Sequence, residues 1–498
     1  MKKSSDNFFS EYYKQLEDSE MQKVNCFFSE FDTHCLLRKS EKRKMKKDFE
    51  KAILYYVNSG MSLDNALIIL DTKYLGGFYA RPSGLWFALD DAAKIYPLSM
   101  EHGRMSLFRL SVYLKKDVVP EILQMALNFT IKRFPAFATT LKNGVFWHYL
   151  DTTKRRFCIE EENDIPCQPL KVARSGSQSF RVLYYKNRVS VEFFHVLTDG
   201  TGGMTFLKVL AAEYIRLLGE NVVLDETLWD INDVPDAEEF ENAFAKVDAS
   251  KNKSGFMDKP ATQMNGKLTA NKPCRIIHFK MDASKLKDAA KKYDATVTAY
   301  LLSLMFLAGK AATDDLHGEA SIQVPVNMRK FYPTKTVRNF SMYCGIRIPL
   351  EKIGRPAEMM AEITRQLTEK TSEEKMNEMI TSAKNIVSSV RYIPLVIKQP
   401  AVKLVYGFLD DNLFTNTLSN LGVVKMPESV SKHIESMDFV LGTATINRAK
   451  CSLVTFNNTA TFSIAKLTVD PSFEEKMYEL MTAEGIDVIV EGSDLYAN

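Results

Sequence analysis

One histidine in the sequence stands where its side chain could act as a base. His195 follows the run Arg188–Phe194, whose alternating apolar residues predict a β-strand, and Val-Leu-Thr then leads to Asp199 and Gly200. Imidazole titrates near neutral pH, so it can remove a proton from a weakly acidic nucleophile. The Asp199 carboxylate, four residues on, could orient the imidazole or pair with a cation and hold the loop in shape. We therefore expect His195 to be catalytic, with Asp199 and Gly200 supporting its loop.

Other motifs that could explain this glycine-rich stretch do not fit its spacing. A dinucleotide-binding fingerprint would need glycine at position 205, which is Thr205, and neither a G-x-S-x-G nor an H-E-x-x-H motif occurs. The other histidines and the seven cysteines show no metal-ligand spacing, so no metal site is expected. The alternative interpretation is a structural histidine, whose hydrogen bonds are all made within the folded protein, beside an aspartate in a turn. The strand, turn and apolar helix around His195 favour the catalytic interpretation.

Several elements must position this histidine. Residues 181–185 and 188–194 alternate like paired strands and are joined by Lys186-Asn187, which predicts a hairpin that ends on His195. Apolar residues then recur at helical spacing from Met204 to Leu218. Earlier, the pattern predicts a strand over 108–114 and a helix over 119–134.

The second half also mixes strands with helices. We expect strands at 275–280, 321–327, 415–421, 452–457 and 459–469, and helices at 284–293, 298–307, 356–374 and 472–484. The N-terminal residues read as helical, with Ser62 as an N-cap. We expect an N-terminal helical extension over 1–84, a first lobe over 85–219, a polar connector over 220–272 and a second lobe over 273–498.

Composition excludes some classes of function. The 65 basic and 62 acidic residues leave a formal charge of +3, which does not favour a nucleic-acid partner. The basic run at 38–47 is interpreted as a solvated helix face rather than a localisation signal. We expect no secretion signal, no transmembrane segment and reduced thiols, and hence a cytoplasmic protein.

The motif Phe193-Phe-His195-Val-Leu-Thr-Asp199-Gly200 resembles the H-x-x-x-D-G motif of the chloramphenicol-acetyltransferase-like superfamily of coenzyme A-dependent acyltransferases. Four other segments in the expected order resemble the superfamily too. Arg133-Phe-Pro135 precedes the motif, and Val324-Pro-Val-Asn-Met-Arg329, Val337-Arg-Asn339-Phe and Ser419-Asn420-Leu-Gly422, the last typical of the alcohol acetyltransferase branch, follow it. The resemblance covers about residues 85 to 490. It implies an α/β (α+β) fold with two lobes and a central channel between them.

The resemblance also implies roles for individual residues. His195 would take the proton of an alcohol or amine that attacks an acyl thioester, and Asp199 would form a structural ion pair with Arg329. Ser419, Asn420 and Asn339 are candidates to bind the oxyanion or the substrate. Acyl-CoA would be a co-substrate, with no cofactor bound, and a monomer is expected because both lobes lie in one chain.

We therefore expect an enzyme, an alcohol O-acetyltransferase-like acyltransferase that moves an acyl group, in the first instance acetyl, from CoA to an alcohol or amine. Phe194 replaces the first of the two adjacent histidines usual in condensation domains, and no carrier-protein module fits in the chain. These features favour a stand-alone enzyme. The alternatives are a non-catalytic protein that binds acyl ligands and a condensation-like protein that uses carrier-bound acyl groups.

Overall fold

The computed structural model describes most of the chain. The described residues are 8–76, 86–91, 93–94, 96–98, 105–152, 155–171, 177–247, 259–269, 274–398, 413–443 and 448–493. The expected boundary between residues 84 and 85 and part of the expected connector lie outside these ranges. No helix in the described ranges is both long and apolar enough to cross a lipid bilayer.

The first lobe is built on a five-stranded sheet in the order β13-β2-β8-β7-β5. The strands are β2 (Leu107–Leu114), β5 (Ile159–Glu161), β7 (Phe180–Tyr185), β8 (Arg188–Phe194) and β13 (Ile434–Leu441). Helices α6 (Pro120–Thr130) and α7 (Gly200–Leu217) complete this lobe, with a core of aliphatic and aromatic side chains between sheet and helices. Lys186 has a φ of 49° in the expected turn, so the predicted hairpin β7–β8 is present.

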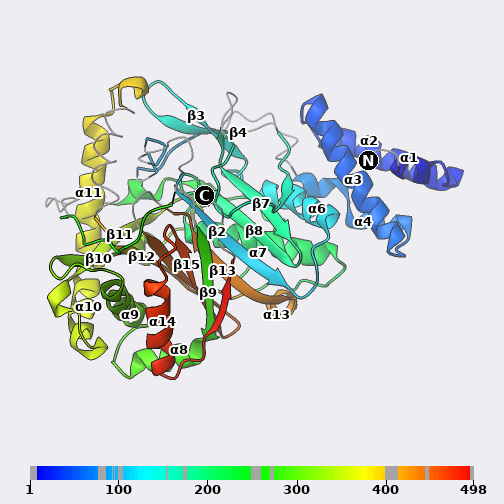
Figure 1. The fold of residues 1–498 in the computed structure, drawn as a ribbon. Helices are drawn as coiled ribbons and strands as arrows, with labels where there is room; N and C mark the ends of the chain where they lie inside the picture. Colours follow the sequence, from blue (N-terminus) through cyan, green and yellow to red (C-terminus); the bar gives the residue numbers. More distant parts are fainter. Residues whose placement is uncertain are drawn as a thin grey trace.

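One strand of this sheet comes from the far end of the sequence. β13 pairs antiparallel with β2, and Phe439 lies opposite Leu110. The expected division at residue 273 therefore does not separate the two sheets, because residues 434–441 complete the first one. In Figure 1 this orange strand lies among the strands of both lobes.

The second lobe is built on a seven-stranded sheet in the order β11-β10-β12-β14-β15-β9-β16. Its strands are β9 (Arg275–Asp282), β10 (Glu319–Asn327), β11 (Ser341–Pro349), β12 (Asn416–Val423), β14 (Ala449–Phe456), β15 (Thr459–Lys466) and β16 (Ile489–Gly492). Helices α8 (Ala283–Lys291), α9 (Val297–Ala311), α10 (Pro356–Lys370) and α14 (Ser472–Ala483) pack around a separate core. The helix expected over 356–374 is interrupted at Thr371, and α11 (Glu373–Ser389) follows.

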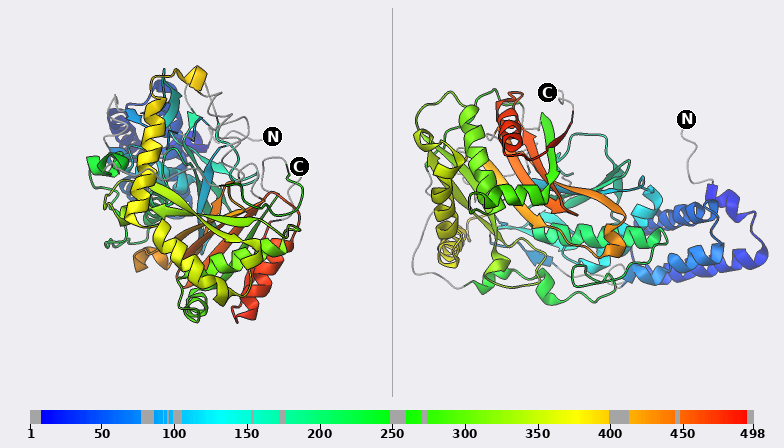
Figure 2. Two further views of the ribbon diagram at one scale, coloured as in Figure 1. Left: turned by 90° about the vertical axis from the view of Figure 1, so that its left-hand side faces the viewer. Right: turned by 90° about the horizontal axis from the view of Figure 1, so that it is seen from below.

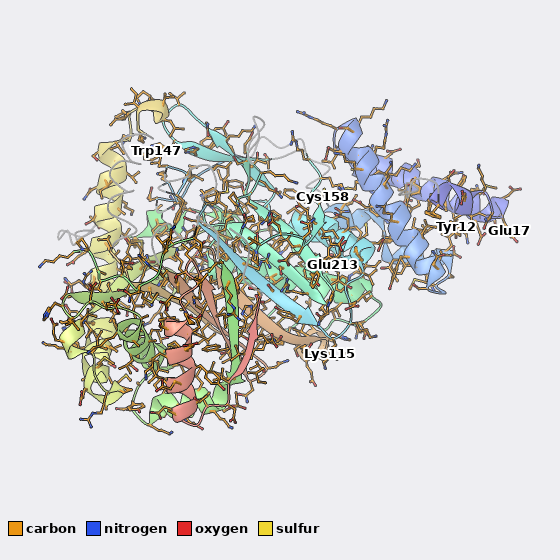
Figure 3. All side chains as sticks on the ribbon, viewed as in Figure 1. Tyr12, Glu17, Lys115, Trp147, Cys158 and Glu213 are labelled. Atoms are coloured by element: carbon orange, nitrogen blue, oxygen red, sulfur yellow. The ribbon has the colours of Figure 1, made fainter. Side chains whose placement is uncertain are left out.

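A small four-stranded sheet, β1-β4-β3-β6, adjoins the first lobe and is contacted by the second. Its strands are β1 (Trp86–Ala88), β3 (Thr139–Asn143), β4 (His148–Thr152) and β6 (Ser177–Gln178). Lys398, which follows α11, places its ammonium 3.2 Å from the ring centroid of Trp147 and donates to the Phe146 carbonyl. Trp147 is labelled in Figure 3, at the hairpin between β3 and β4.

The N-terminal helices project from the side of the first lobe, as both Figure 1 and Figure 2 show. They are α1 (Phe8–Tyr13), α2 (Asp18–His34), α3 (Lys39–Asn58) and α4 (Leu63–Ile69). Ser62 caps α4 by accepting from the Asn65 amide, as expected. The Phe49 ring lies against Phe129 of α6, and the Tyr56 hydroxyl donates to the Leu217 carbonyl. The extension therefore shares the hydrophobic core of the first lobe.

The expected polar connector holds the lobes together in its described parts. Arg133 of the first lobe makes a bidentate ion pair with Glu239 and stacks 4.6 Å from the centroid of the Trp229 ring. The Glu239 carbonyl in turn accepts from the Val337 amide of the second lobe. Phe244 is buried in the second core, against Phe340.

Candidate functional site

His195 lies directly after the last residue of β8. Its backbone amide donates to the Ser106 carbonyl at 2.9 Å, and the chain turns back so that the Leu197 amide donates to the Phe194 carbonyl. α7 then begins at Gly200. The end of an internal strand therefore carries the histidine, and the start of a helix follows within five residues. His195 itself is partly exposed, although its neighbours on both sides are buried.

The imidazole sits between aromatic rings. Tyr96 stacks on it with ring centroids 4.9 Å apart and planes inclined by 26°, and Phe108 approaches at 5.4 Å in an edge orientation. The buried Nδ1 makes no hydrogen bond to another residue in the described ranges. Burial lowers the pKa of His195 below its ordinary value of 6.5, and the charge of Lys450 lowers it further. Asp199 and the histidine's own backbone carbonyl partly oppose this shift. The imidazole is therefore neutral at pH 7 and can accept a proton.

Asp199 directs its carboxylate into the protein framework. Oδ1 caps α7 by accepting from the amides of Thr201 and Gly202, at 3.1 and 3.0 Å. Oδ2 accepts from Arg329 Nη1 and from the Phe340 amide, both at 2.7 Å. Both oxygens are thus engaged away from the imidazole, and the expected ion pair with Arg329 is present.

Arg329 ties the motif to the second lobe. Besides Asp199, its guanidinium donates to the carbonyls of Thr336 and Arg338. Asn327 adds a hydrogen bond across the same seam, from Nδ2 to the Thr201 hydroxyl at 3.1 Å. The segment 327–340 therefore encloses the start of α7.

Two glycines of the motif are required by close contacts. A Cβ at Gly200 would lie 2.5 Å from the side chain of Leu421 on β12. A Cβ at Gly202 would lie 2.0 Å from the Val337 carbonyl oxygen, which also accepts from the Thr198 hydroxyl. These contacts place β12 and the 337–340 segment directly against the His195 loop.

The strand that bears the candidates Ser419 and Asn420 therefore lies beside the loop. The Asn420 amide is committed to structure, because Nδ2 donates to Thr298 and Oδ1 accepts from the Gly422 amide. Ser419 lies opposite Ser452 on β14, whose hydroxyl donates to a carbonyl of the first lobe, so Ser419 shares the face that meets the first lobe. Asn339 is buried, with Oδ1 bonded to Ser341 and Nδ2 without a partner in the described ranges.

Sequence reasoning did not single out Tyr96 or the buried ion pair of Asp90 and Arg338. Asp90 is fully buried, with Oδ1 3.0 Å from Arg338 Nη2, and burial raises its pKa to about 7 although Arg338 opposes the shift. Arg338 directly precedes the candidate Asn339. The sequence therefore pointed to this segment, but not to Arg338 itself. Lys450, on the second-lobe strand β14, was also missed, because a lone lysine gives no signal in the sequence.

Comparisons with known proteins support the fold. No protein-family model matches the chain, and no curated protein matches its sequence. Among solved structures, polyketide synthase associated protein 5 from Mycobacterium tuberculosis aligns with a TM-score of 0.53 and 11% identity, over 79% of this chain and 96% of that one. F. graminearum TRI101, complexed with coenzyme A and T-2 mycotoxin, aligns with a TM-score of 0.54 and 10% identity, over 80% and 97%.

The first condensation domain of the CDA synthetase aligns with a TM-score of 0.51 and 10% identity, over 82% of this chain and 99% of that one. The chain is similar to all three over nearly their whole length. It therefore has the two-lobed α/β fold that coenzyme A-dependent acyltransferases share with condensation domains.

Proposed function

We propose that this protein is an acyltransferase that moves an acyl group from acyl-CoA to an alcohol or amine, with His195 as the general base. One observation carries the proposal. A partly exposed imidazole, with its pKa lowered by burial, stands where the loop of the first lobe meets β12 and the 337–340 segment of the second. A neutral imidazole there can accept the proton of a nucleophile.

The reaction needs two proton transfers. His195 takes the proton from the acceptor hydroxyl or amine while that oxygen or nitrogen attacks the thioester carbonyl, which gives a tetrahedral oxyanion. When the carbon–sulfur bond breaks, the imidazolium returns the proton to the departing thiolate. The acylated acceptor and free coenzyme A leave, and no covalent acyl-enzyme is formed.

The oxyanion requires a hydrogen-bond donor close to the thioester carbonyl. Ser419 is the side chain we propose for this role, because β12 lies against Gly200 through Leu421 while the Asn420 amide is engaged by Thr298 and Gly422. Asn339, with a buried Nδ2 that lacks a partner in the described ranges, remains a candidate to bind substrate.

We further propose that Asp199 and Arg329 are structural. A carboxylate that caps α7 and pairs with a guanidinium of the other lobe fixes the loop instead of relaying a proton. We also propose that the enzyme is cytoplasmic and monomeric and that it acts on small acceptors.

The test is a survey of donors and acceptors with the purified protein. Acetyl-CoA and longer acyl-CoA thioesters are incubated with alcohols and amines, thiol release is monitored, and the acylated product is identified by mass spectrometry. Acceptor-dependent release of coenzyme A together with a matching product supports the proposal. Transfer only from an acyl group held on a phosphopantetheinyl carrier protein would instead establish the condensation-like alternative, and tight acyl-CoA binding without any transfer the non-catalytic one.

A further inference from the structure

A histidine that acts as a base must hold its ring in one orientation, because small misplacements of reacting groups cost large factors in rate. In many enzymes a carboxylate bonded to Nδ1 fixes that ring. Here both oxygens of Asp199 are engaged by α7, Arg329 and Phe340, and Nδ1 makes no hydrogen bond to another residue in the part of the chain that the structure describes. Something other than a carboxylate must therefore orient the imidazole, and the histidine's own backbone carbonyl, which acts to raise its pKa, is one such contact.

Two aromatic rings of other residues also contact the imidazole. Tyr96 lies nearly parallel to it, with centroids 4.9 Å apart, and so covers one face of the ring. Phe108 of β2 meets it edge-on at 5.4 Å. Both distances fall within the roughly 4.5–7 Å range in which aromatic pairs attract each other. The two contacts differ in direction, and together they restrict both the tilt and the position of the imidazole.

The segment that carries Tyr96 is anchored to the second lobe. Asp90 is fully buried against Arg338, and its backbone carbonyl accepts from the amide of Lys94, which lies two residues before Tyr96 in the sequence. Arg338 also donates to the carbonyls of Ala88 and Phe240. The phenol ring is thus placed by contacts that reach the same 337–340 segment that binds Asp199.

We propose that Tyr96 is a positioning residue, whose ring holds the His195 imidazole in its reactive orientation, and that the Asp90–Arg338 pair fixes the segment that carries it. This inference rests on the proposed function of His195. It assigns the action of Tyr96 to the ring and not to its hydroxyl. It also explains why a histidine with no carboxylate partner can have a defined orientation.

The experiment compares Tyr96→Phe, which keeps the ring, with Tyr96→Leu, which removes it. Tyr185→Leu is the matched control, since Tyr185 is 46% exposed at the hairpin turn. We expect Tyr96→Phe to keep kcat within about threefold, and Tyr96→Leu to lose roughly tenfold to a hundredfold in kcat, with KM for acyl-CoA and the melting temperature little changed. An unchanged kcat in Tyr96→Leu, or an equal loss in Tyr96→Phe, would overturn the proposal.

A spectroscopic measurement tests the stacking without depending on turnover. The ring protons of His195, identified by their loss in His195→Gln, should resonate upfield of an ordinary histidine because of the Tyr96 ring current, and should move back in Tyr96→Leu. Ordinary shifts in the wild type would contradict the stacking. If the shifts agree but no donor supports transfer, the proposed function fails while the positioning of the ring stands.

Discussion

At the scale of single residues, His195 and Asp199 have different surroundings and therefore different roles in the motif. The imidazole is partly exposed, contacts aromatic rings and has a lowered pKa. The carboxylate is buried, accepts four hydrogen bonds and pairs with Arg329. A sequence pattern that joins the two residues therefore combines one group suited to proton transfer with another suited to holding a loop.

The direction of the His195 pKa shift predicts the pH dependence of the reaction. Because the pKa lies below 6.5, the imidazole is already deprotonated at pH 7, and kcat/KM for acyl transfer should be flat above that pH. Activity should decline only as the pH falls through the lowered pKa, where the base becomes protonated. Steady-state rates between pH 5 and 8.5 measure this. An acidic limb centred above pH 7 would contradict it.

Removing the charge of Asp199 should destabilise the protein. Asp199→Asn leaves the Arg329 guanidinium, whose side chain is only 11% exposed, without its carboxylate. Loss of one partner of a buried pair costs on the order of 3–5 kcal/mol in the free energy of unfolding, and activity should fall with it. Urea denaturation followed by circular dichroism measures the change.

The control for that experiment is Glu358→Gln, which breaks the solvent-exposed pair with Arg355. Exposed pairs contribute little to stability, so this variant should unfold like the wild type. Equal effects of the two substitutions would show that Asp199 does not have the structural role assigned to it.

At the scale of elements, the start of α7 is defined by what packs against it. Glycine inside a helix normally weakens it relative to alanine. At Gly202, however, a Cβ would meet the Val337 carbonyl at 2.0 Å and Thr198 Oγ1 at 2.4 Å. The cost of that clash exceeds the gain in helix propensity.

Gly202→Ala should therefore destabilise the protein and disturb the His195 loop, with a loss of about 1–3 kcal/mol typical of overpacking. Gly309→Ala, in α9, is the matched control, since a Cβ there meets nothing closer than 4.0 Å. It should be neutral or stabilising by up to about 1 kcal/mol. Thermal unfolding of both variants provides the comparison. A stable, fully active Gly202→Ala would refute the close approach of the 337 segment.

Elements with strong local periodicity could be predicted from the sequence. The hairpin that ends at His195, helix α7 and helix α14 all follow from alternation or helical spacing. The structure of 337–349 could not be predicted in the same way, because the contacts of Arg338 and the pairing of β11 with β10 depend on residues distant in the chain. Strand β13 was missed for the same reason. Its partner β2 is more than 300 residues away.

The candidate site shows the same limit. His195, Asp199 and Arg329 could be recognised because they lie in segments that resemble known sequence motifs. Tyr96 and Asp90 lie in a segment with no periodicity, and only the tertiary structure brings them to the imidazole and to Arg338. The Asn420 side chain was a candidate on sequence grounds, yet its contacts with Thr298 and Gly422 hold the stretch of β12 where its pairing with β14 is irregular.

At the scale of the whole molecule, the N-terminal helices are part of the first lobe and not an independent attachment. Tyr12 and Glu17, labelled in Figure 3, mark their far end, whereas Phe49 and Tyr56 join the core beside α6 and α7. An ion pair between the buried Asp48 and the partly buried Arg156 crosses the same junction. The extension and the lobe should therefore unfold together.

Phe49→Ala tests this coupling. The side chain is fully buried, and truncation of a buried phenylalanine costs about 3–5 kcal/mol. Calorimetry should show one transition shifted to lower temperature, with Phe8→Ala, at an exposed position on α1, as the control. A separate early transition for residues 8–75, with the main one unmoved, would contradict a shared core.

The account as a whole depends on His195 acting as a base, and one measurement addresses this directly. The rate of coenzyme A thiol release is compared between the wild type and His195→Ala, with the acceptor identified in the donor and acceptor survey and with folding verified by circular dichroism. We expect release to fall by roughly 10²–10⁴-fold, the usual contribution of a general base. A folded His195→Ala that releases thiol at the wild-type rate would contradict the proposed mechanism.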